Sequence, residues 1–203
     1  MSKQIILIGG FHEIIELSEM CGYEIVGIID NQLSGEYFGY PILGKDKDAK
    51  KIISTGKNIQ LVISPDSPII RMKLVEYYRH FGCEFAKLIS PEARVSKTVT
   101  IEQGSIVQSG VNISASTQIG CFVKLNTNCN VMHDNSISDF VTIAPNAVAL
   151  GRVKICNGAY IGANSTLLPG VCVGEEAIIG AGAVVTKSVA DKCTVIGVPA
   201  RPL

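Results

Sequence analysis

One histidine in the second half of the chain stands beside a carboxylate and could move a proton. His133 is followed directly by Asp134, in the stretch VMHDNSIS. A neutral imidazole can act as a general base near pH 7, and an adjacent carboxylate can fix its tautomer. The pair is equally compatible with a plain polar histidine on a solvated surface. The two residues alone therefore leave both interpretations open.

A glycine one predicted repeat further along strengthens the catalytic interpretation. Gly151 lies at position 133 + 18, close to the small residue Ala149. A backbone N–H with no side chain beside it can receive the negative charge that develops on a substrate oxygen. If residues at this separation stack, Gly151 leaves room for a substrate at the imidazole. The repeat pattern of the chain predicts such stacking.

An aliphatic residue returns at every sixth position from Val95 to Val185 without an insertion. Four positions after each one, a small or β-branched residue recurs, with Asn135 as the polar exception. Three positions after each sixth-position aliphatic residue, the chain is rich in residues that tolerate positive φ and can turn a corner: Gly104, Gly110, Asn128, Asn146, Gly158, Asn164, Gly170 and Gly182. This period predicts a parallel β-helix of about five coils, each of roughly 18 residues in three short strands.

The first part of the chain has the pattern of a small parallel sheet with helices. Strands are expected at 4–8, 24–29, 61–64 and 85–89, and helices at 13–21, 45–54 and 69–81. The glycine- and aromatic-rich residues 32–44 are expected to form a connection. We therefore predict a Rossmann-like α/β domain at 1–90 and an all-β helix at 91–203.

Open α/β sheets bind ligands at the carboxyl ends of their strands. The candidate substrate-binding residues at that edge are Gly10, Phe11, His12, Asp30, Asn31 and Ser64. Asp30 follows the glycine turn by about twenty residues, where a dinucleotide fold places the acid that grips a ribose. The stretch GGFHEI lacks the spaced glycines of an NAD fingerprint, so it indicates NAD only weakly. Asp30 and His12 are also compatible with a turn and a helix cap.

Charge and cysteine usage narrow the class of protein. The 203 residues carry 18 basic and 18 acidic side chains without a basic stripe, which argues against binding to nucleic acid or to an anionic membrane. No apolar stretch approaches the length of a membrane span, and the first residues resemble a buried strand more than a signal peptide. We expect a cytoplasmic protein whose seven cysteines are free, since they are odd in number and form no CxxC pair.

The motifs together resemble one family. GGFHE and IIDN in the sheet, MHD in the repeats, and GAGAVVTKSV and IGVPA near the end are similar to the left-handed β-helix hexapeptide-repeat acyltransferases. Within them, the chain is most similar to sugar-nucleotide N-acetyltransferases and sialic-acid-type O-acetyltransferases of bacterial surface glycan pathways. The resemblance implies a left-handed helix, although the usual crossover rule favours the right hand. It also implies a homotrimer with acetyl-CoA between neighbouring prisms.

The resemblance assigns catalytic roles to three residues. His133 matches the general base and Asp134 its acidic partner. Gly151 matches the N–H that stabilises the oxyanion on the acetyl-CoA thioester. No metal is expected.

The resemblance also assigns ligand contacts. Ala163 and Ala181 match backbone contacts to pantetheine, while His12, Asp30 and Asn31 match the sugar-nucleotide site. Thr142 stands nine residues after the base, where relatives often have a second histidine that touches acetyl-CoA, and its hydroxyl is the expected substitute.

We therefore expect an acetyl-CoA-dependent N-acetyltransferase that acts on a nucleotide-linked 4-amino-deoxy sugar, with UDP as the expected nucleotide. An O-acetyltransferase of a sialic-acid-like sugar is the nearest alternative, and a non-catalytic nucleotide-sugar-binding trimer is a second. A β-helix carbonic anhydrase needs three metal-binding histidines, and the repeat region contains only His133.

Overall fold

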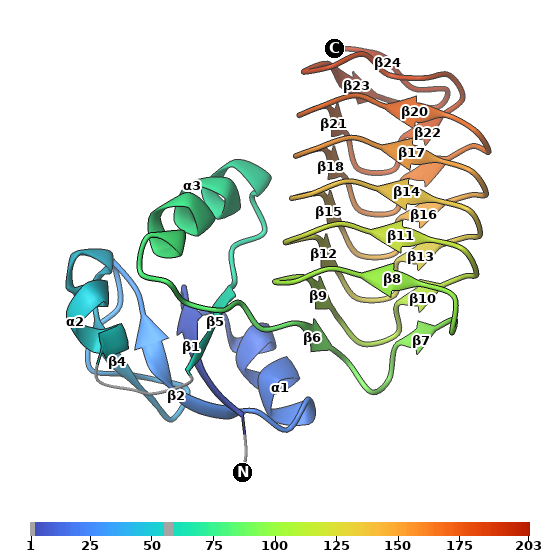
Figure 1. The fold of residues 1–203 in the computed structure, drawn as a ribbon. Coiled ribbons are helices and arrows are strands. Elements are labelled where there is room, and N and C mark those ends of the chain that lie inside the picture. Colours follow the sequence, from blue (N-terminus) through green and yellow to red (C-terminus); the bar gives the residue numbers. More distant parts are fainter. Residues whose placement is uncertain (1–2, 55–58) are drawn as a thin grey trace.

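The computed structural model describes residues 3–54 and 59–203, which form a small α/β domain beside a three-sided prism (Figure 1). In the α/β domain, β1 (Gln4–Ile8) lies between β2 (Glu24–Ile29) and β5 (Gln60–Ile63), and all three are parallel. Residues Ile5 to Ile8 are at most 1% exposed. This continuous apolar run is typical of a parallel strand that is covered on both faces.

The helices begin close to where the sequence predicts. α1 (His12–Met20) buries Ile14 and Leu17 against the sheet, and α2 (Ala49–Ser54) follows a 3₁₀ turn at Asp46–Asp48. α3 (Pro68–Arg79) has proline in its first position and Ser67 as its N-cap, whose hydroxyl accepts the Ile70 N–H at 3.4 Å. Both residues are favoured at a helix start.

The expectation of an irregular connection at 32–44 is wrong for its second half. β3 (Glu36–Tyr37) and β4 (Tyr40–Gly44) form an antiparallel hairpin, and β4 pairs in parallel with β2. The sheet order is β3-β4-β2-β1-β5. This pairing depends on a neighbouring strand, which glycine and aromatic content do not reveal.

The expected fourth strand of this sheet is also wrong in part. Phe85 makes a single parallel bridge to Leu61 in β5. β6 (Leu88–Ile89) instead pairs with β9 and is the first strand of the prism along the chain.

The prism has three faces of short parallel strands. The first face contains β7 (Arg94–Val95), β10 (Asn112–Ile113), β13 (Asn130–Val131), β16 (Val148–Ala149), β19 (Thr166–Leu167) and β22 (Val184–Val185). The second contains β8 (Thr100–Ile101), β11 (Gln118–Ile119), β14 (Ser136–Ile137), β17 (Lys154–Ile155) and β20 (Cys172–Val173). The third contains β6, β9 (Ile106–Val107), β12 (Lys124–Leu125), β15 (Thr142–Ile143), β18 (Tyr160–Ile161), β21 (Ile178–Ile179), β23 (Thr194–Ile196) and, antiparallel at its end, β24 (Arg201–Pro202).

The predicted register is confirmed. Val131 pairs with Ala149 and Ala149 with Leu167, so residues 18 apart lie above one another. The sixth-position aliphatic residues from Val107 to Val185 are at most 2% exposed and form one continuous core. The glycine and asparagine corners all have positive φ, as at Asn128 and Asn146.

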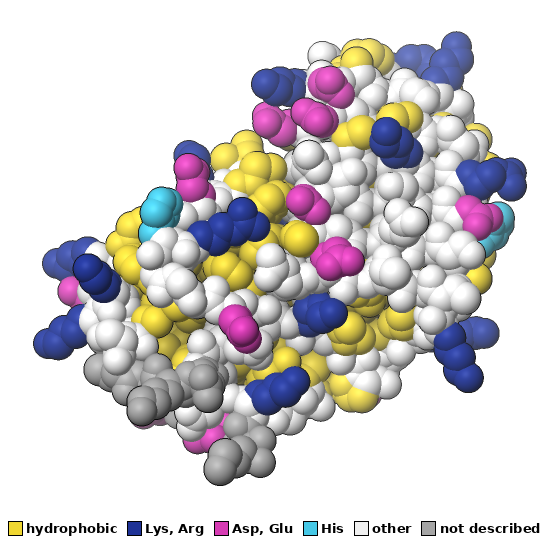
Figure 2. Space-filling view, viewed as in Figure 1, with side chains coloured by type: hydrophobic (Ala, Val, Ile, Leu, Met, Phe, Trp, Pro, Cys, Tyr) yellow, Lys and Arg dark blue, Asp and Glu magenta, His cyan; other side chains and the backbone are white. Residues whose placement is uncertain are grey.

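Two phenylalanines occupy corner positions where glycine or asparagine is usual, with φ of 55° at Phe122 and 60° at Phe140. Their rings stack with centroids 5.3 Å apart, and the Phe85 ring of the α/β domain meets the edge of Phe122 at 4.9 Å. Phe122 is fully buried. Figure 2 shows hydrophobic side chains gathered where the two parts meet. These corners therefore dock the α/β domain against the prism.

A buried arginine on α3 completes this interface. Arg71 is 1% exposed, and its guanidinium donates to the Phe122 and Phe140 carbonyls of the prism, both at 2.8 Å, and to the Pro65 and Asp66 carbonyls at 2.9 Å. Burial lowers the pKa of Arg71 to about 10, an effect that the Asp66 charge partly offsets.

Within 3–54 and 59–203, no helix combines the length and apolar character that crossing a bilayer requires.

Candidate active site

His133 lies at the corner between the first and second faces, directly after β13. Its Nδ1 is 2.8 Å from Asp134 Oδ2, and the two side chains are 51% and 52% exposed. Asp134 occupies the corner position with φ of 60°, a conformation that aspartate tolerates better than most residues. With Nδ1 bound to the carboxylate, Nε2 is the nitrogen left to accept a proton.

Gly151 lies directly over the imidazole, as the register predicts. A Cβ at this position would be 2.7 Å from both Nε2 and Cε1 of His133, closer than real side chains approach. The neighbours of Gly151 bond to the coils on either side: the Leu150 N–H donates to Leu167 and the Arg152 N–H to His133. Across the described residues, no such bond uses the Gly151 N–H. Glycine is therefore needed here because a side chain would collide with the His133 imidazole.

The coil that carries His133 is tied to the next coil by Asn135, the polar exception in the inward column. Asn135 is 2% exposed, and its amide donates to the Met132 carbonyl at 2.9 Å and accepts the Val153 N–H. A buried amide whose bonds are made holds its surroundings rigidly. The sequence marked this residue only as an exception and missed its role in positioning His133.

The Asp30 carboxylate lies at the glycine turn but is occupied by backbone groups. It accepts the Gly10 N–H at 2.9 Å, the Gln32 N–H at 2.7 Å and the Leu33 N–H at 3.0 Å. Partial burial by itself would raise the pKa of Asp30, but these three donors outweigh it and hold the pKa below its usual value. Asp30 therefore shapes the loop at the carboxyl edge.

The Asn31 side chain is also committed within the chain. Its amide donates to Asp46 Oδ2 at 2.6 Å, and its oxygen accepts the Asp46 N–H at 3.1 Å. Asn31 thus caps the turn before α2, a role that the sequence did not suggest.

Three aromatic rings surround the start of α1. His12 stacks on Phe38 of the β3–β4 hairpin, with ring centroids 5.5 Å apart and planes 25° apart. On the other side, Lys124 Nζ of the prism stands 5.7 Å from the centre of the Phe11 ring. α1 has no side-chain cap, because its N-cap residue is Phe11. Phe11 and His12 therefore lie at an uncapped helix start, and their contact with a ligand stays a prediction.

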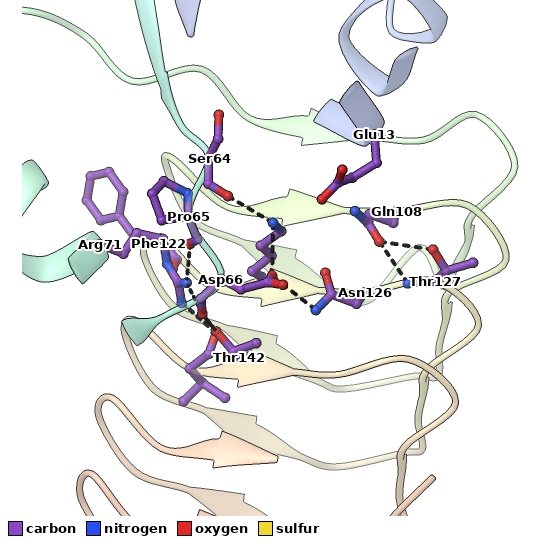
Figure 3. A network of polar contacts seen from close by, with 12 residues as sticks. Glu13, Ser64, Pro65, Asp66, Arg71, Gln108, Phe122, Asn126, Thr127 and Thr142 are labelled. Atoms are coloured by element: carbon purple, nitrogen blue, oxygen red, sulfur yellow. Dashed lines mark hydrogen bonds and ion pairs between the residues drawn. The ribbon is translucent and has the colours of Figure 1, made fainter. Parts of the chain in front are cut away.

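A polar cluster lies where the loop after β5 crosses the prism (Figure 3). Lys124 is 1% exposed, and its ammonium contacts Asp66 Oδ1 at 2.9 Å and the Ser64 carbonyl at 2.8 Å. Burial lowers the pKa of Lys124, and Asp66 opposes that shift. Asn126 donates to the same carboxylate at 3.2 Å. The repeat pattern did not reveal that Lys124 is buried, because this residue occupies an outward strand position.

Ser64 itself is the unexplained member of this cluster. It is completely buried, and its hydroxyl is the buried side-chain group without a hydrogen-bond partner in the described part of the chain. An unsatisfied buried hydroxyl costs stability and calls for a ligand or a water. Ser64 directly follows β5, at a strand end, and its role as a ligand contact stays a prediction.

The expectation that Thr142 contacts acetyl-CoA does not agree with its position. Thr142 is fully buried on β15. Its hydroxyl donates to the Asp66 carbonyl at 2.6 Å and accepts from Arg71 at 3.0 Å (Figure 3). The docked α/β domain covers this strand, so the hydroxyl fastens the two parts of the chain to each other.

The candidate residues form two groups on opposite sides of the prism. The α/β domain packs on the third face, and Ala163 and Ala181 lie at the corner that joins the third face to the first. His133 and Gly151 lie at the corner between the first and second faces, which is opposite the third face. One chain therefore does not bring His133 to the sheet edge that carries Gly10, His12 and Asp30.

Comparison with known proteins gives a consistent family. The model described as "Bacterial transferase hexapeptide (six repeats)" matches residues 152–187. A GDP-perosamine N-acetyltransferase from Escherichia coli is 33% identical over 178 residues, which cover 79% of each chain. No group of three histidine, cysteine, aspartate or glutamate side chains in the described residues could hold a metal ion.

Solved structures resemble the whole chain. PerB from Caulobacter crescentus, in complex with CoA and GDP-perosamine, has a TM-score of 0.94 at 29% identity and covers 98% of this chain and 97% of its own. The acetyltransferase domain of PglB from Neisseria gonorrhoeae, in complex with acetyl-CoA, has a TM-score of 0.92 at 28% identity and covers all of both chains. The chain therefore belongs to the left-handed β-helix hexapeptide-repeat acyltransferases and, within them, to the acetyl-CoA-dependent sugar-nucleotide N-acetyltransferases.

Proposed function

We propose that this enzyme acetylates the amino group of a GDP-linked 4-amino-deoxy sugar. The expectation of UDP is replaced, because the relatives that cover most of the chain and are named for their substrate act on or bind GDP-perosamine. The observation that carries the catalytic assignment is the His133–Asp134 pair beneath the bare Gly151 backbone. A solved histidine-to-alanine variant of the Caulobacter relative still holds CoA and GDP-perosamine, so ligand binding there does not need that histidine.

His133 has the chemistry of a general base. Asp134 accepts the Nδ1–H, which leaves the Nε2 lone pair to take a proton from the neutral sugar amine as its nitrogen attacks the thioester carbonyl. The C–N bond forms, and the carbonyl electrons move onto oxygen. We assign the stabilisation of that oxyanion to the Gly151 N–H. When the oxyanion collapses, the C–S bond breaks and the CoA thiolate leaves with the proton from His133.

We infer that the complete site lies between protomers of a homotrimer. The outward side chains of the first face above β7 are uncharged: Asn112, Asn130, Val148, Thr166 and Val184. The second face, in contrast, exposes Lys154. An uncharged face of small side chains suits burial against another prism. Such packing can bring the His133 corner of one protomer to the crevice of its neighbour.

The α/β domain is then the nucleotide-sugar-binding unit, which we propose to be Rossmann-like and to end near residue 90. Its crevice offers the open start of α1 to a diphosphate, since helix N-termini bind anions. Acetyl-CoA lies along the corner with Ala163 and Ala181. All seven cysteines are free. The cytoplasm stays our prediction for the location of the enzyme.

The test is CoA thiol release from acetyl-CoA with GDP-, UDP- and dTDP-linked 4-amino sugars and with sialic-acid-type acceptors. We expect release with a GDP-linked amino sugar and a loss of at least about a hundredfold in His133→Ala, since general-base catalysis contributes about 10² to 10⁴. His80→Ala, at the end of α3, is the matched control and should remain active. Full activity of His133→Ala would disprove the mechanism, and release only with a hydroxyl acceptor would favour the O-acetyltransferase.

A further inference from the structure

The β3–β4 hairpin ends in an exposed aromatic residue beside the nucleotide crevice. Phe38 is 66% exposed and stacks on His12, while the Tyr37 ring meets Phe38 edge-on at 4.8 Å. Tyr37 also packs over the glycine turn, because a Cβ on Gly10 would lie 3.4 Å from its ring. The hairpin tip therefore belongs to the wall of the crevice.

The backbone at this tip is unusual for the residue that it carries. Phe38 has φ of 49° and Gly39 has φ of 83°. Two-residue turns with positive φ at both positions favour Asn-Gly or Asp-Gly. Phenylalanine adds backbone strain and leaves most of its ring in solvent. A residue held in a backbone conformation that it does not favour, with no gain in stability elsewhere in the chain, points to a function.

The crevice has a direction that identifies the part of the ligand at this tip. On the β5 side it faces the prism, where Lys124 stands over Phe11 and binds Asp66. The acceptor amine must lie on that side, because the transferred acetyl group is carried by the prism. The open start of α1 lies between and suits the diphosphate. The hairpin is on the side of β2 and β4, so the nucleobase reaches it.

We propose that Phe38 and His12 form a stacking platform for the base of the nucleotide sugar and that the platform favours a purine over a pyrimidine. This inference rests on the proposed function and adds its base selectivity. A base can extend this stack on the exposed Phe38 ring, while His12 supports that ring from its other side. Stacking on an aromatic side chain accepts any base with a π-face, and a fused purine overlaps the exposed ring more than a pyrimidine does.

The first experiment measures nucleotide affinity by calorimetry with GDP and UDP. Phe38→Asn installs the residue that this turn favours, so the variant should fold at least as stably as the wild type. We expect its Kd for GDP to rise about tenfold or more, the range of one base–aromatic stack, with an unchanged Kd for acetyl-CoA. Phe38→Tyr should retain affinity. Met20→Gln, which removes an exposed apolar side chain at the other end of α1, is the control.

A second experiment observes the stack directly. The chain has no tryptophan, so Phe38→Trp introduces a single fluorophore at the platform. We expect GDP to quench its emission with a midpoint at the calorimetric Kd, and UDP to require a higher concentration.

The outcomes separate this inference from the proposed function. An active enzyme whose Phe38→Asn variant binds GDP with wild-type Kd would overturn the platform and leave the transferase intact. Equal or tighter binding of UDP by the wild type would overturn the purine preference. A wild type that binds no nucleoside diphosphate would reject both proposals.

Discussion

A single methyl group at Gly151 should disable catalysis without unfolding the protein. Its Cβ would lie 2.7 Å from Nε2 and Cε1 of His133, whereas ordinary contacts begin near 3.4 Å. The imidazole must therefore move by about 0.7 Å, the difference between 3.4 and 2.7 Å, and a misplacement of about 1 Å can cost about 10² in rate. The methyl group also covers the N–H that we assign to the oxyanion, whose loss costs about 10² to 10³. We expect kcat of Gly151→Ala to fall by at least about a hundredfold.

Stability should respond differently. Gly151 does not have the positive φ that would strain an alanine backbone, and the half-exposed imidazole can move into solvent. Gly82→Ala is the reverse case, because φ there is 68° and no atom lies within 4 Å of the added Cβ. It should lower the free energy of unfolding by about 1 kcal/mol and leave kcat unchanged.

The assay is thiol release at saturating acetyl-CoA and nucleotide sugar, with the melting temperature of each variant measured alongside. Wild-type kcat in Gly151→Ala would refute the assignment of the space above His133 to the reacting atoms. A loss of kcat matched by a large drop in melting temperature would refute the claim that the effect is local.

Three further predictions concern the α/β domain and its docking. Arg71→Met leaves buried carbonyls of both parts unpaired and should reduce the free energy of unfolding in urea by about 3 to 5 kcal/mol, whereas a change below 1 kcal/mol would show that the clamp is dispensable. Folding lowers the pKa of Asp30, so its carboxylate stabilises the fold at a pH above its unfolded-state pKa, near 4, and loses this effect as the pH falls through the lower folded-state pKa. Asp30→Asn should therefore be less stable than the wild type at pH 7 and approach it in acid. A stability difference that does not change with pH would contradict this. Thr142→Val should lose about 1 to 2 kcal/mol of stability but keep the KM for acetyl-CoA, and a raised KM would restore the expected cofactor contact.

Some of the missed residues left a signal in the sequence. Phe122 and Phe140 stand in the corner column where glycine and asparagine recur, and an aromatic side chain there indicates that something packs against the corner. Lys124 stands at an outward strand position, where a buried charge has no precedent in the repeat. The Phe38–Gly39 turn was hidden because residues 32–44 were treated as irregular.

The sequence by itself determined the prism and the geometry of the corner that carries His133. Each coil repeats the environment of the one below, so adding 18 to a position gives its neighbour, and the pairing of His133 with Gly151 follows from the period alone. The βαβ core of the first domain was equally accessible, since its strands are continuous apolar runs.

Only the tertiary structure decided how the two parts fit together. Arg71 and Thr142 look like ordinary surface residues in their own segments, yet both are buried by contacts between residues far apart in the chain. The same docking places the crevice on the third face and leaves His133 at the opposite corner. Periodicity is a local property and carries no information about which face a separate domain covers, so our proposal that the site is divided between protomers depends on the docked structure.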